Sequence, residues 1–408
     1  MENFSDVIII GGGPCGSYSA WNLVKKSVNV TVLEEHNEIG VPCHCAGHLS
    51  INSLKNLGFY PLPGKIVENV FSGAKIYSPS GIELPLRFTA PVTCTVNRSL
   101  FDKHIAQLAE KAGAHYCLGT RAEMLITDNG YVKGVVAKRN HKTKFLGKAV
   151  LDAEGTASKI LRQAGLAPPA KGKFVYGVNA EVENVKDIEN DTVEVFLGRK
   201  YAPGFYAWII PKGQGQAKVG LGTKTGNPKM LLQKFMQKHP IASRKLQEAK
   251  ILREIYHTIS LGGPIPETYS NGFITVGDAA SQVKPTTGGG VIFGLNCATI
   301  AADVVSKAIK NNNTSAQFLS TYQQRFTKLL GFDMKIMLKI RRVLDKMSDE
   351  KLDEFVRLCR KLHVENAIKN LEEIDFQGKT LLNALQSPKT IASLAYLLIA
   401  YLKQQVKI

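Results

Sequence analysis

The sequence lacks long apolar runs. Among its 408 residues no run reaches the roughly 18 apolar residues that a membrane-spanning helix needs, and the nearest, Ile391 to Leu402, contains Ser393 and two tyrosines. The N-terminus has no basic segment and its first apolar run ends at Gly11, so we expect no secretory signal. These features predict a cytoplasmic protein and leave open peripheral binding to the inner face of the membrane.

The cysteines follow no disulfide framework. The seven cysteines are an odd number without regular spacing, which is typical of a protein from a reducing compartment. Cys43, His44, Cys45 and His48 cluster, but no second ligand pair follows at zinc-finger spacing, so we expect no metal site. The role of Cys43 stays open.

Acidic residues are few beside the basic ones. The chain has 34 Asp+Glu against 52 Lys+Arg, a formal net charge of +18. Basic and aromatic residues are not interleaved as in nucleic-acid-binding proteins, so we expect no nucleic-acid partner. The charge favours an anionic partner: an acidic redox protein, an anionic membrane surface or a phosphate-bearing substrate.

An apolar run meets a glycine cluster near the start of the chain. Residues 6 to 10 predict a strand, and the motif Gly11-x-Gly13-x-x-Gly16 follows directly. The first glycine permits a sharp turn, the second lets the backbone approach a pyrophosphate, and the third lets the next helix pack on the strand. That helix, which begins around Pro14 and Cys15, directs its N-terminus at the phosphates.

A second predicted strand, Val28 to Leu33, supports this dinucleotide site. It ends at Glu34 and Glu35, about 20 residues after the turn, where a ribose hydroxyl needs an acceptor.

Two more predicted strands end in an acid and a glycine. Asp152-Ala153-Glu154-Gly155 ends one and Gly277-Asp278 ends the other. FAD needs such a set of turns because its pyrophosphate, ribityl chain and adenosine ribose are held separately. We expect Asp278 to accept hydrogen bonds from the ribityl hydroxyls.

The segment that follows Asp278 is rich in glycine and starts a helix. Its free N–H groups would face the flavin N1/C2 carbonyl edge, where negative charge accumulates on reduction. The residues concerned are Pro285, Gly288, Gly289, Gly290 and Val291. Arg98, at the entry to another predicted helix, is a candidate for contact with phosphate or flavin, or for a surface salt bridge.

This ordered set of motifs resembles the p-hydroxybenzoate-hydroxylase-type flavoproteins. Within them, the segment Pro42-Cys43-His44-Cys45-Ala46-Gly47 and the strand Tyr206-x-Trp208-x-Ile210-Pro211, followed by Gly220-x-Gly222, resemble the geranylgeranyl reductases, specifically the archaeal digeranylgeranylglycerophospholipid reductases. Ile210 stands where that family has phenylalanine, and Glu154 where the superfamily usually has aspartate.

The resemblance implies an α/β (α+β) fold with three regions. They are a discontinuous Rossmann-like FAD-binding domain of the p-hydroxybenzoate-hydroxylase/glutathione-reductase type (1–65, 95–165 and 270–310), a sheet-rich substrate domain (66–94 and 166–269) and a C-terminal helical region (311–408). In that region Thr390 to Lys403 is continuously apolar. Such a helix closes the core or lies on lipid.

The resemblance also implies the chemistry: reduction of geranylgeranyl C=C bonds in archaeal-type membrane lipid precursors. Cys45, Tyr206 and Trp208 are the implied catalytic residues, with Ala46 and Gly47 near the flavin. Tyr206, Trp208, Ile210 and Pro211 are the implied substrate residues. A strand of period two puts Tyr206, Trp208 and Ile210 on one face and Phe205, Ala207 and Ile209 on the other, so one face can wall an apolar cavity for an isoprenoid.

Several points stay open. The proton donor is Tyr206, a cysteine thiol or water, and the electron donor is ferredoxin, a reduced nicotinamide or another flavoprotein, since no second GxGxxG is present. A flavin monooxygenase or halogenase, a quinone-linked electron-transfer flavoprotein and a flavin-retaining lipid carrier are the alternatives. The quinone-linked type usually carries a cysteine cluster for an iron–sulfur centre, and residues 311–408 hold Cys359 alone.

Overall fold

The computed structural model describes residues 3–368 and 374–378, so the apolar segment Thr390 to Lys403 lies outside the described residues. The chain forms two compact units. Unit 1 comprises the described residues up to Cys43, Arg98–Lys173 and Ser260–Met334; unit 2 comprises His44–Asn97, Phe174–Ile259 and the described residues from Lys335 onward.

Unit 1 is a Rossmann-like layer structure. Its sheet has the order β17 (Tyr269–Ser270), β18 (Phe273–Thr275), β11 (Lys142–Asp152), β1 (Asn3–Ile10), β2 (Val30–Leu33) and β8 (His115–Cys117), and the hairpin β9 (Arg121–Asp128) and β10 (Tyr131–Lys138) pairs with β11. β1 pairs in parallel with both β2 and β11. Buried Ile8, Val150 and Phe273 belong to the core of this unit.

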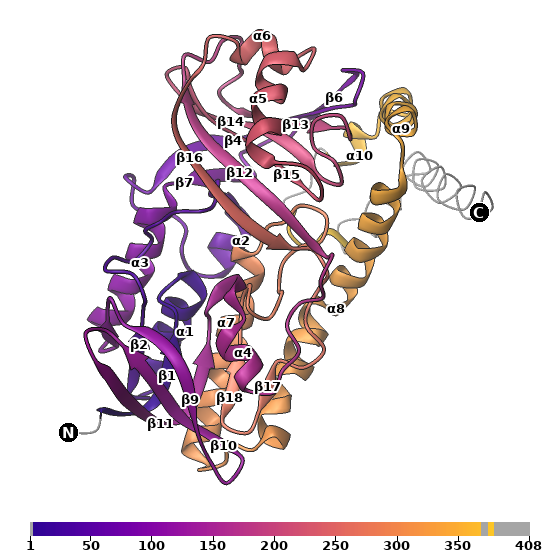
Figure 1. The fold of residues 1–408 in the computed structure, drawn as a ribbon. Helices are drawn as coiled ribbons and strands as arrows, with labels where there is room; N and C mark the ends of the chain where they lie inside the picture. Colours follow the sequence, from indigo (N-terminus) through magenta and orange to yellow (C-terminus); the bar gives the residue numbers. More distant parts are fainter. Residues whose placement is uncertain (1–2, 369–373, 379–408) are drawn as a thin grey trace. The chain divides into compact units, whose positions relative to one another are not determined.

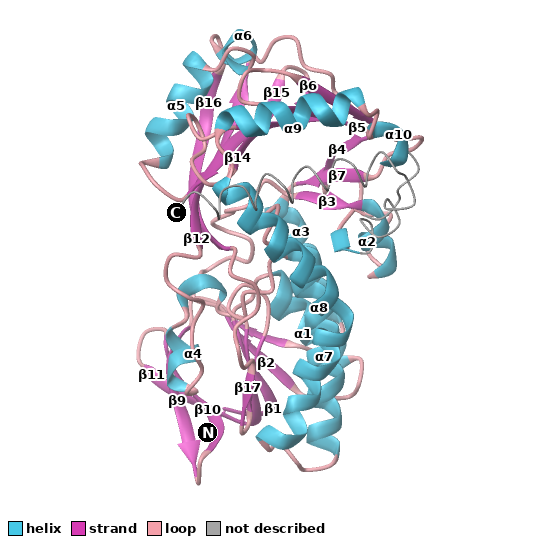
Figure 2. Ribbon diagram, turned by 90° about the vertical axis from the view of Figure 1, so that its right-hand side faces the viewer, coloured by secondary structure: helices cyan, strands magenta, loops and turns pink. Residues whose placement is uncertain are grey.

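Helices α1 (Pro14–Val24), α3 (Arg98–Lys111) and α7 (Val291–Lys310) also belong to unit 1, with short α4 (Lys159–Gln163) (Figures 1 and 2). Among the described residues α7 alone is long and apolar enough to cross a membrane, and 72% of its most apolar 18-residue stretch is buried inside the protein. Its apolar character is therefore that of a core helix.

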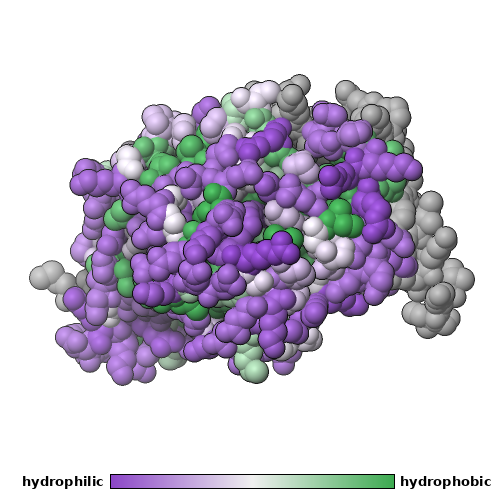
Figure 3. All heavy atoms as spheres, turned by 90° about the horizontal axis from the view of Figure 1, so that it is seen from above, coloured by the Kyte–Doolittle hydropathy of each residue, from purple (hydrophilic) through white to green (hydrophobic). Residues whose placement is uncertain are grey.

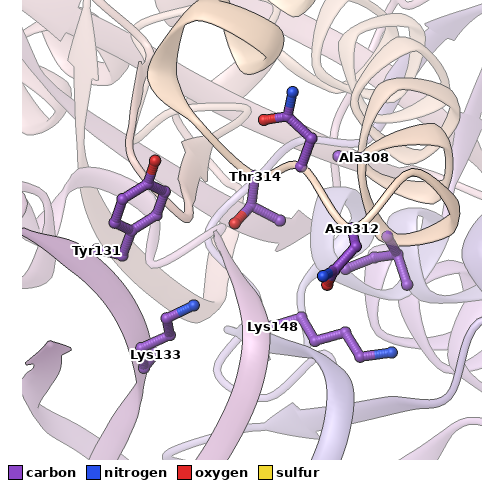
Figure 4. A pocket seen from close by; sticks show the side chains of 8 residues that line it. Tyr131, Lys133, Lys148, Ala308, Asn312 and Thr314 are labelled. Carbon is purple, nitrogen blue, oxygen red and sulfur yellow. The ribbon is translucent and has the colours of Figure 1, made fainter. Parts of the chain in front are cut away.

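A cavity of 240 Å³ lies in unit 1 away from the carboxyl ends of the strands (Figure 4). Tyr131, Lys133, Lys148 and Thr314 are among its lining residues. Lys148 lies four positions before the end of β11 and pairs with Asp6 at 2.7 Å. The cavity is thus separate from the predicted cofactor turns, which follow the strand ends.

Unit 2 contains a seven-stranded sheet. Its order is β16 (Lys250–Ser260), β12 (Phe174–Glu183), β15 (Gln216–Thr223), β14 (Tyr206–Gly213), β13 (Thr192–Leu197), β5 (Gly73–Tyr77) and β6 (Glu83–Arg87). Helices α5 (Pro228–Lys238) and α6 (Ala242–Leu246) cover one face, where Val178, Ala207 and Ile209 pack against Leu232 and Phe235.

The remaining elements of unit 2 are smaller. A three-stranded sheet has the order β3 (His48–Ser50), β7 (Thr93–Val96) and β4 (Val67–Phe71), beside α2 (Ile51–Asn56). α9 (Asp349–Lys361) packs Val356 and Cys359 against Leu84 of β6, and α10 (Glu365–Ile368) follows.

These units depart from the expected domain boundaries. Residues 166–173 and 260–269 belong to unit 1, and residues 95–97 belong to unit 2. Residues 44–65 belong to unit 2, because β3 pairs with β7 and not with the Rossmann-like sheet. The described part of 311–408 is not a third unit: the division falls inside α8 (Ala316–Lys346), between Met334 and Lys335.

The alternation along β14 holds from its first residue onward. Ala207 and Ile209 join the cluster under α5, whereas Trp208 and Ile210 pack with Phe71 and Val193 on the other face. The expectation for Phe205 is wrong: it precedes the strand, and its ring stacks on Tyr206 at a centroid distance of 4.3 Å. The two-residue period applies only where the ladder has formed.

The absence of a side chain at Gly220 leaves room for the indole of Trp208. The two residues are directly paired between β14 and β15, and a Cβ on Gly220 would lie 2.4 Å from Cζ2 of Trp208 and 2.5 Å from the carbonyl oxygen of Val178. The indole thus occupies the space that a side chain at position 220 would fill, and its Nε1 donates to Oδ1 of buried Asn179 at 3.2 Å.

We expect Gly220→Ala to lower the free energy of unfolding by about 2 kcal/mol, because the new methyl group overpacks the indole and a rigid carbonyl. Urea denaturation measures this. Gly64→Ala is the matched control in the same unit, since no atom lies within 4 Å of its Cβ position, and it should change the value by less than about 0.5 kcal/mol. Equal stabilities of the two variants would contradict the packing assigned to Trp208.

Candidate functional site

The three turns that were expected to form one cofactor site lie together. Ile10 is the register partner of Asp152, and Asp152 is the partner of Thr275, so β1, β11 and β18 end side by side. Because parallel strands end at one edge of the sheet, the turns that follow them share that edge.

The glycine turn has the geometry that a pyrophosphate site requires. Gly11 has φ +93°, and a Cβ there would lie 2.4 Å from the carbonyl oxygen of Ala153; a Cβ on Gly16 would lie 1.9 Å from that of Gly11. The Cβ position of Gly13, by contrast, has no atom within 4 Å. The turn is therefore closed toward the protein and open at Gly13, where α1 begins.

Cys15 faces the protein. A Cβ on Gly277 would come within 2.8 Å of its sulfur, and one on Gly294 within 2.4 Å, so the thiol occupies the space left by these two glycines. Burial raises its pKa. Cys15 can therefore offer a ligand its backbone, while its side chain seals the contact of α1 with α7.

Glu34, and not Glu35, lies at the glycine turn. Its carboxylate is buried and accepts from Gly12 N–H at 2.7 Å and from His36 N–H at 2.9 Å. Glu35 is half exposed and pairs with Arg121 at 3.4 Å. Of the two acids that the sequence offered for a ribose, Glu34 alone is held beside the turn.

The turn after β11 gives its two acids different roles. The carboxylate of Glu154 accepts from the N–H groups of Lys159, Ile160 and Leu161, each at 2.9 Å, so its side chain caps α4. The side chain of Glu154 therefore holds the N-terminus of α4, and its expected contact with the cofactor, like that of Gly155, stays a prediction.

Asp152 is fully buried at the end of β11. Desolvation and the nearby charge of Glu154 raise the pKa of Asp152 to about 8. Hydrogen bonds that its carboxylate accepts from Glu154 N–H and from the Thr275 hydroxyl oppose this rise. In the sequence Asp152 was only one residue of a predicted turn. Its burial in the structure favours the protonated carboxyl group.

Asp278 lies in the turn after β18, beside Gly290, the N-cap residue of α7. It is exposed to solvent, and a Cβ on Gly290 would lie 2.8 Å from its Oδ1. Surrounding protein raises the pKa of Asp278, and the positive charge of Arg98 opposes that rise. The loop between Asp278 and α7 is closed by hydrogen bonds from Gly288 N–H to Lys284 O and from Lys284 N–H to Gly289 O. An accessible carboxylate beside a helix N-terminus suits a polyhydroxylated ligand.

Arg98 is not a surface residue. It is buried and pairs with Asp102 through two contacts, Nε to Oδ1 at 3.1 Å and Nη2 to Oδ2 at 3.0 Å. Sequence reasoning missed Asp102, although its i,i+4 spacing on a predicted helix was a usable signal.

In unit 2 a buried lysine joins the Cys45 loop to the aromatic strand. Lys218 is the register partner of Ile210, and its ammonium donates to the carbonyl oxygens of Ala46 at 2.9 Å and Val96 at 3.2 Å and pairs with Glu68. Ala46 packs against the Trp208 and Ile210 cluster. The sequence gave no sign of this contact, because the partners are more than a hundred residues apart.

A buried cation from α8 lies near the beginning of the aromatic strand β14. Tyr206 contacts Trp208 edge-on at a centroid distance of 5.8 Å, and the guanidinium of buried Arg341 lies 5.6 Å from the ring of Phe205 and pairs with Asp345. Burial raises the pKa of Tyr206, so its phenol stays protonated at neutral pH. Because side chains alternate along β14, Pro211 is on the same face as Ile209, which is opposite to the face of Trp208 and Ile210.

In the part of the chain that the structure describes, no group of three or more His, Cys, Asp or Glu residues could hold a metal ion.

Comparison with known proteins identifies the family. Two family models match: FAD dependent oxidoreductase over residues 6–173 and geranylgeranyl reductase catalytic domain over residues 175–256. The digeranylgeranylglycerophospholipid reductase of Methanocaldococcus jannaschii is 34% identical over 356 residues, covering 86% of this chain and 90% of that one. The chain belongs to the digeranylgeranylglycerophospholipid reductase family. A second relative, digeranylgeranylglycerophospholipid reductase 2 of Methanopyrus kandleri, is 33% identical and covers 92% of this chain and 96% of its own.

Solved structures agree on the fold. A geranylgeranyl bacteriochlorophyll reductase-like protein from Thermoplasma acidophilum matches with a TM-score of 0.87 at 28% identity, covering 97% of this chain and all of that one. The halogenase PltM in complex with FAD matches with a TM-score of 0.70 at 16% identity, which shows a common fold alone. The predicted family, fold class and enzyme class, an FAD-dependent oxidoreductase, are confirmed.

We expect Lys218→Met to lower the free energy of unfolding of this family member by about 3 kcal/mol, because it leaves the carboxylate of Glu68 buried with a single cation. Lys212, the other partner of Glu68 at 3.2 Å, is more exposed, and Lys212→Met should cost about 1 kcal/mol. Urea denaturation compares them. A smaller loss in the double variant Lys218→Met/Glu68→Gln than in Lys218→Met is also expected; equal or larger loss would show that the unpaired carboxylate is not the cause.

We also expect a pH dependence from Asp152. Its folded pKa of about 8 lies above the ordinary 3.8, so the folded state binds the proton more tightly and the free energy of unfolding falls as pH rises between these values. Asp152→Asn should flatten this slope in chemical denaturation of the apoprotein, while Asp128→Asn, at an exposed site on β9, should leave it unchanged. A parental slope in Asp152→Asn would count against the assignment.

Proposed function

We propose that this chain reduces C=C double bonds of geranylgeranyl chains in archaeal-type membrane lipid precursors, with FAD as its cofactor. The observation that carries the proposal is the apolar face of β14, where Trp208 and Ile210 lie with Phe71 and Val193, next to the Ala46 end of the Cys45 loop. This face occurs in a chain of the digeranylgeranylglycerophospholipid reductase family.

The residues of unit 1 fit FAD. The open side of Gly13 and the N-terminus of α1 suit the pyrophosphate, since unpaired N–H groups at a helix start attract anions. Glu34 suits the adenosine ribose, exposed Asp278 suits the ribityl hydroxyls, and the N-terminus of α7 at Val291 suits the flavin carbonyl edge. When bound and reduced, FAD supplies the hydride for the alkene.

The residues of unit 2 suit the other half of the reaction. An isoprenoid offers no hydrogen bonds, so shape and aromatic contact must position it. Reduction without an activating carbonyl develops positive charge at carbon, which apolar and aromatic walls that exclude water tolerate better than a nucleophile would. The protonated phenol of Tyr206 and the thiol of Cys45 are the two side chains that we propose as proton donors.

We further propose an acidic electron-donor protein such as ferredoxin, or a reduced nicotinamide, and a cytoplasmic location with peripheral membrane binding. The net charge of +18 supports an anionic partner. The face of the molecule seen in Figure 3 is mostly hydrophilic, with small apolar patches between polar side chains.

The proposal predicts that purified protein, reconstituted with FAD and reduced by dithionite under argon, adds two hydrogens for each geranylgeranyl double bond reduced, read as a gain of about 2 mass units by mass spectrometry of the lipid. Hydroxylated lipid in air with no product under argon would indicate a monooxygenase instead. Tight lipid binding with a flavin that no donor reduces would indicate a carrier.

The two tryptophans of the chain give a matched pair. Trp208→Phe should lower kcat/KM roughly tenfold, because it removes indole contact area and the bond to Asn179 from the proposed substrate wall. Trp21→Phe, on α1 under Lys25, should leave kcat/KM unchanged. If the two variants changed kcat/KM by the same factor, Trp208 would not be part of the substrate wall.

A further inference from the structure

A buried hydrogen-bond chain connects helix α8 to the turn that carries Asp278. The backbone N–H of Gly277 donates to Oε1 of Gln282 at 2.8 Å, and Nε2 of Gln282 donates to the hydroxyl of Tyr322 at 2.7 Å. Gln282 and Tyr322 are both 0% exposed. The chain therefore runs from α8 through one amide group to the residue immediately before Asp278.

The direction of each bond is fixed by chemistry. Gly277 N–H can only donate, so the amide of Gln282 presents its oxygen to Gly277 and its nitrogen to Tyr322. The Tyr322 oxygen is then an acceptor, which leaves its proton for the thiol of Cys297, a further hydrogen-bond partner of the phenol. Without the hydroxyl, the Gln282 amide would lose the partner that orients it, and an unpaired N–H would remain in a fully buried site.

Gly277 is a position where such orientation matters. Its φ of +69° is in the left-handed region, and a Cβ at this position would lie 2.8 Å from the sulfur of Cys15, so the backbone of the turn passes close to that side chain. The carbonyl of Gly277 also accepts from the N–H groups of Ala280 and Gln282, at 3.1 and 3.0 Å. Gln282 therefore clamps both the N–H and the C=O of Gly277.

We propose that Tyr322 is a positioning residue for the cofactor: through Gln282 it fixes the Gly277 turn and thereby the direction of the Asp278 carboxylate. The inference rests on the proposed FAD site. Tyr322 lies on α8, 44 positions after Asp278 in the sequence. It would act through Gln282 without contacting the cofactor.

Tyr322→Phe removes one oxygen atom and keeps the ring that contacts Phe326 at a centroid distance of 5.1 Å. We expect FAD to bind roughly tenfold more weakly, because a free Gln282 amide no longer holds the turn. Isothermal titration of the apoprotein with FAD measures the Kd. Tyr77→Phe is the control, since it also removes a phenol that donates to a side chain, Glu83 at 2.9 Å, and should leave the FAD Kd unchanged.

A double-mutant cycle separates positioning from general loss of stability. Gln282→Met breaks the same chain at its middle, so Tyr322→Phe should have no further effect on the FAD Kd in the Gln282→Met background. Each variant is unfolded in urea alongside. If Tyr322→Phe does not fold, Gln282→Met alone tests the chain and should weaken FAD binding by a similar factor.

Two outcomes would overturn the inference: an FAD Kd in Tyr322→Phe within twofold of the parent, or additive effects of Tyr322→Phe and Gln282→Met. These outcomes differ from failure of the proposed function. A parent protein that binds no FAD removes the basis of both, and a parent that binds FAD but reduces no prenyl double bond removes the function while the Kd comparison still decides the role of Tyr322.

Discussion

The structure of unit 1 depends on the parallel register of β1, β11 and β18. Because Ile10, Asp152 and Thr275 are aligned across the sheet, the turns that follow them meet at one edge. That alignment brings the carbonyl oxygen of Ala153 against Gly11, at a distance that excludes any side chain there. A shift of one residue in either pairing would separate the turns and reverse which side chains are buried.

The same edge shows how burial changes the roles of acids that look alike in sequence. Asp152 is fully buried and accepts a hydrogen bond from Thr275. Glu154 caps the first turn of α4, and of the three acids Asp278 alone is exposed, beside the N-cap residue of α7. Glycine at position 290 leaves room for that carboxylate. Accessibility, rather than residue type, therefore singles out Asp278 for a ligand, and the Gln282 and Tyr322 bonds behind it supply rigidity that the exposed turn lacks by itself.

Unit 2 follows a comparable logic with apolar contacts. Gly220 leaves space for the indole of Trp208, and Lys218, opposite Ile210, holds the loop of Ala46 over the same face. A buried ammonium is costly unless its donors are satisfied, and here Glu68 and two carbonyl oxygens satisfy it. The polar network thus fixes the loop beside a surface that itself offers a substrate no polar group.

The sequence by itself determined the glycine turn, the strand ends, the family and the alternation of Ala207 to Ile210, because each of these depends on local spacing or on motifs that persist in the order of the chain. It did not determine which of Glu34 and Glu35 faces the turn, that Arg98 pairs with Asp102, or that Glu154 caps a helix. Those choices depend on burial and on partners distant in sequence. Only the tertiary structure decided them, and it also placed residues 44–65 with unit 2, since strand pairing between β3 and β7 is a long-range contact that no local pattern encodes.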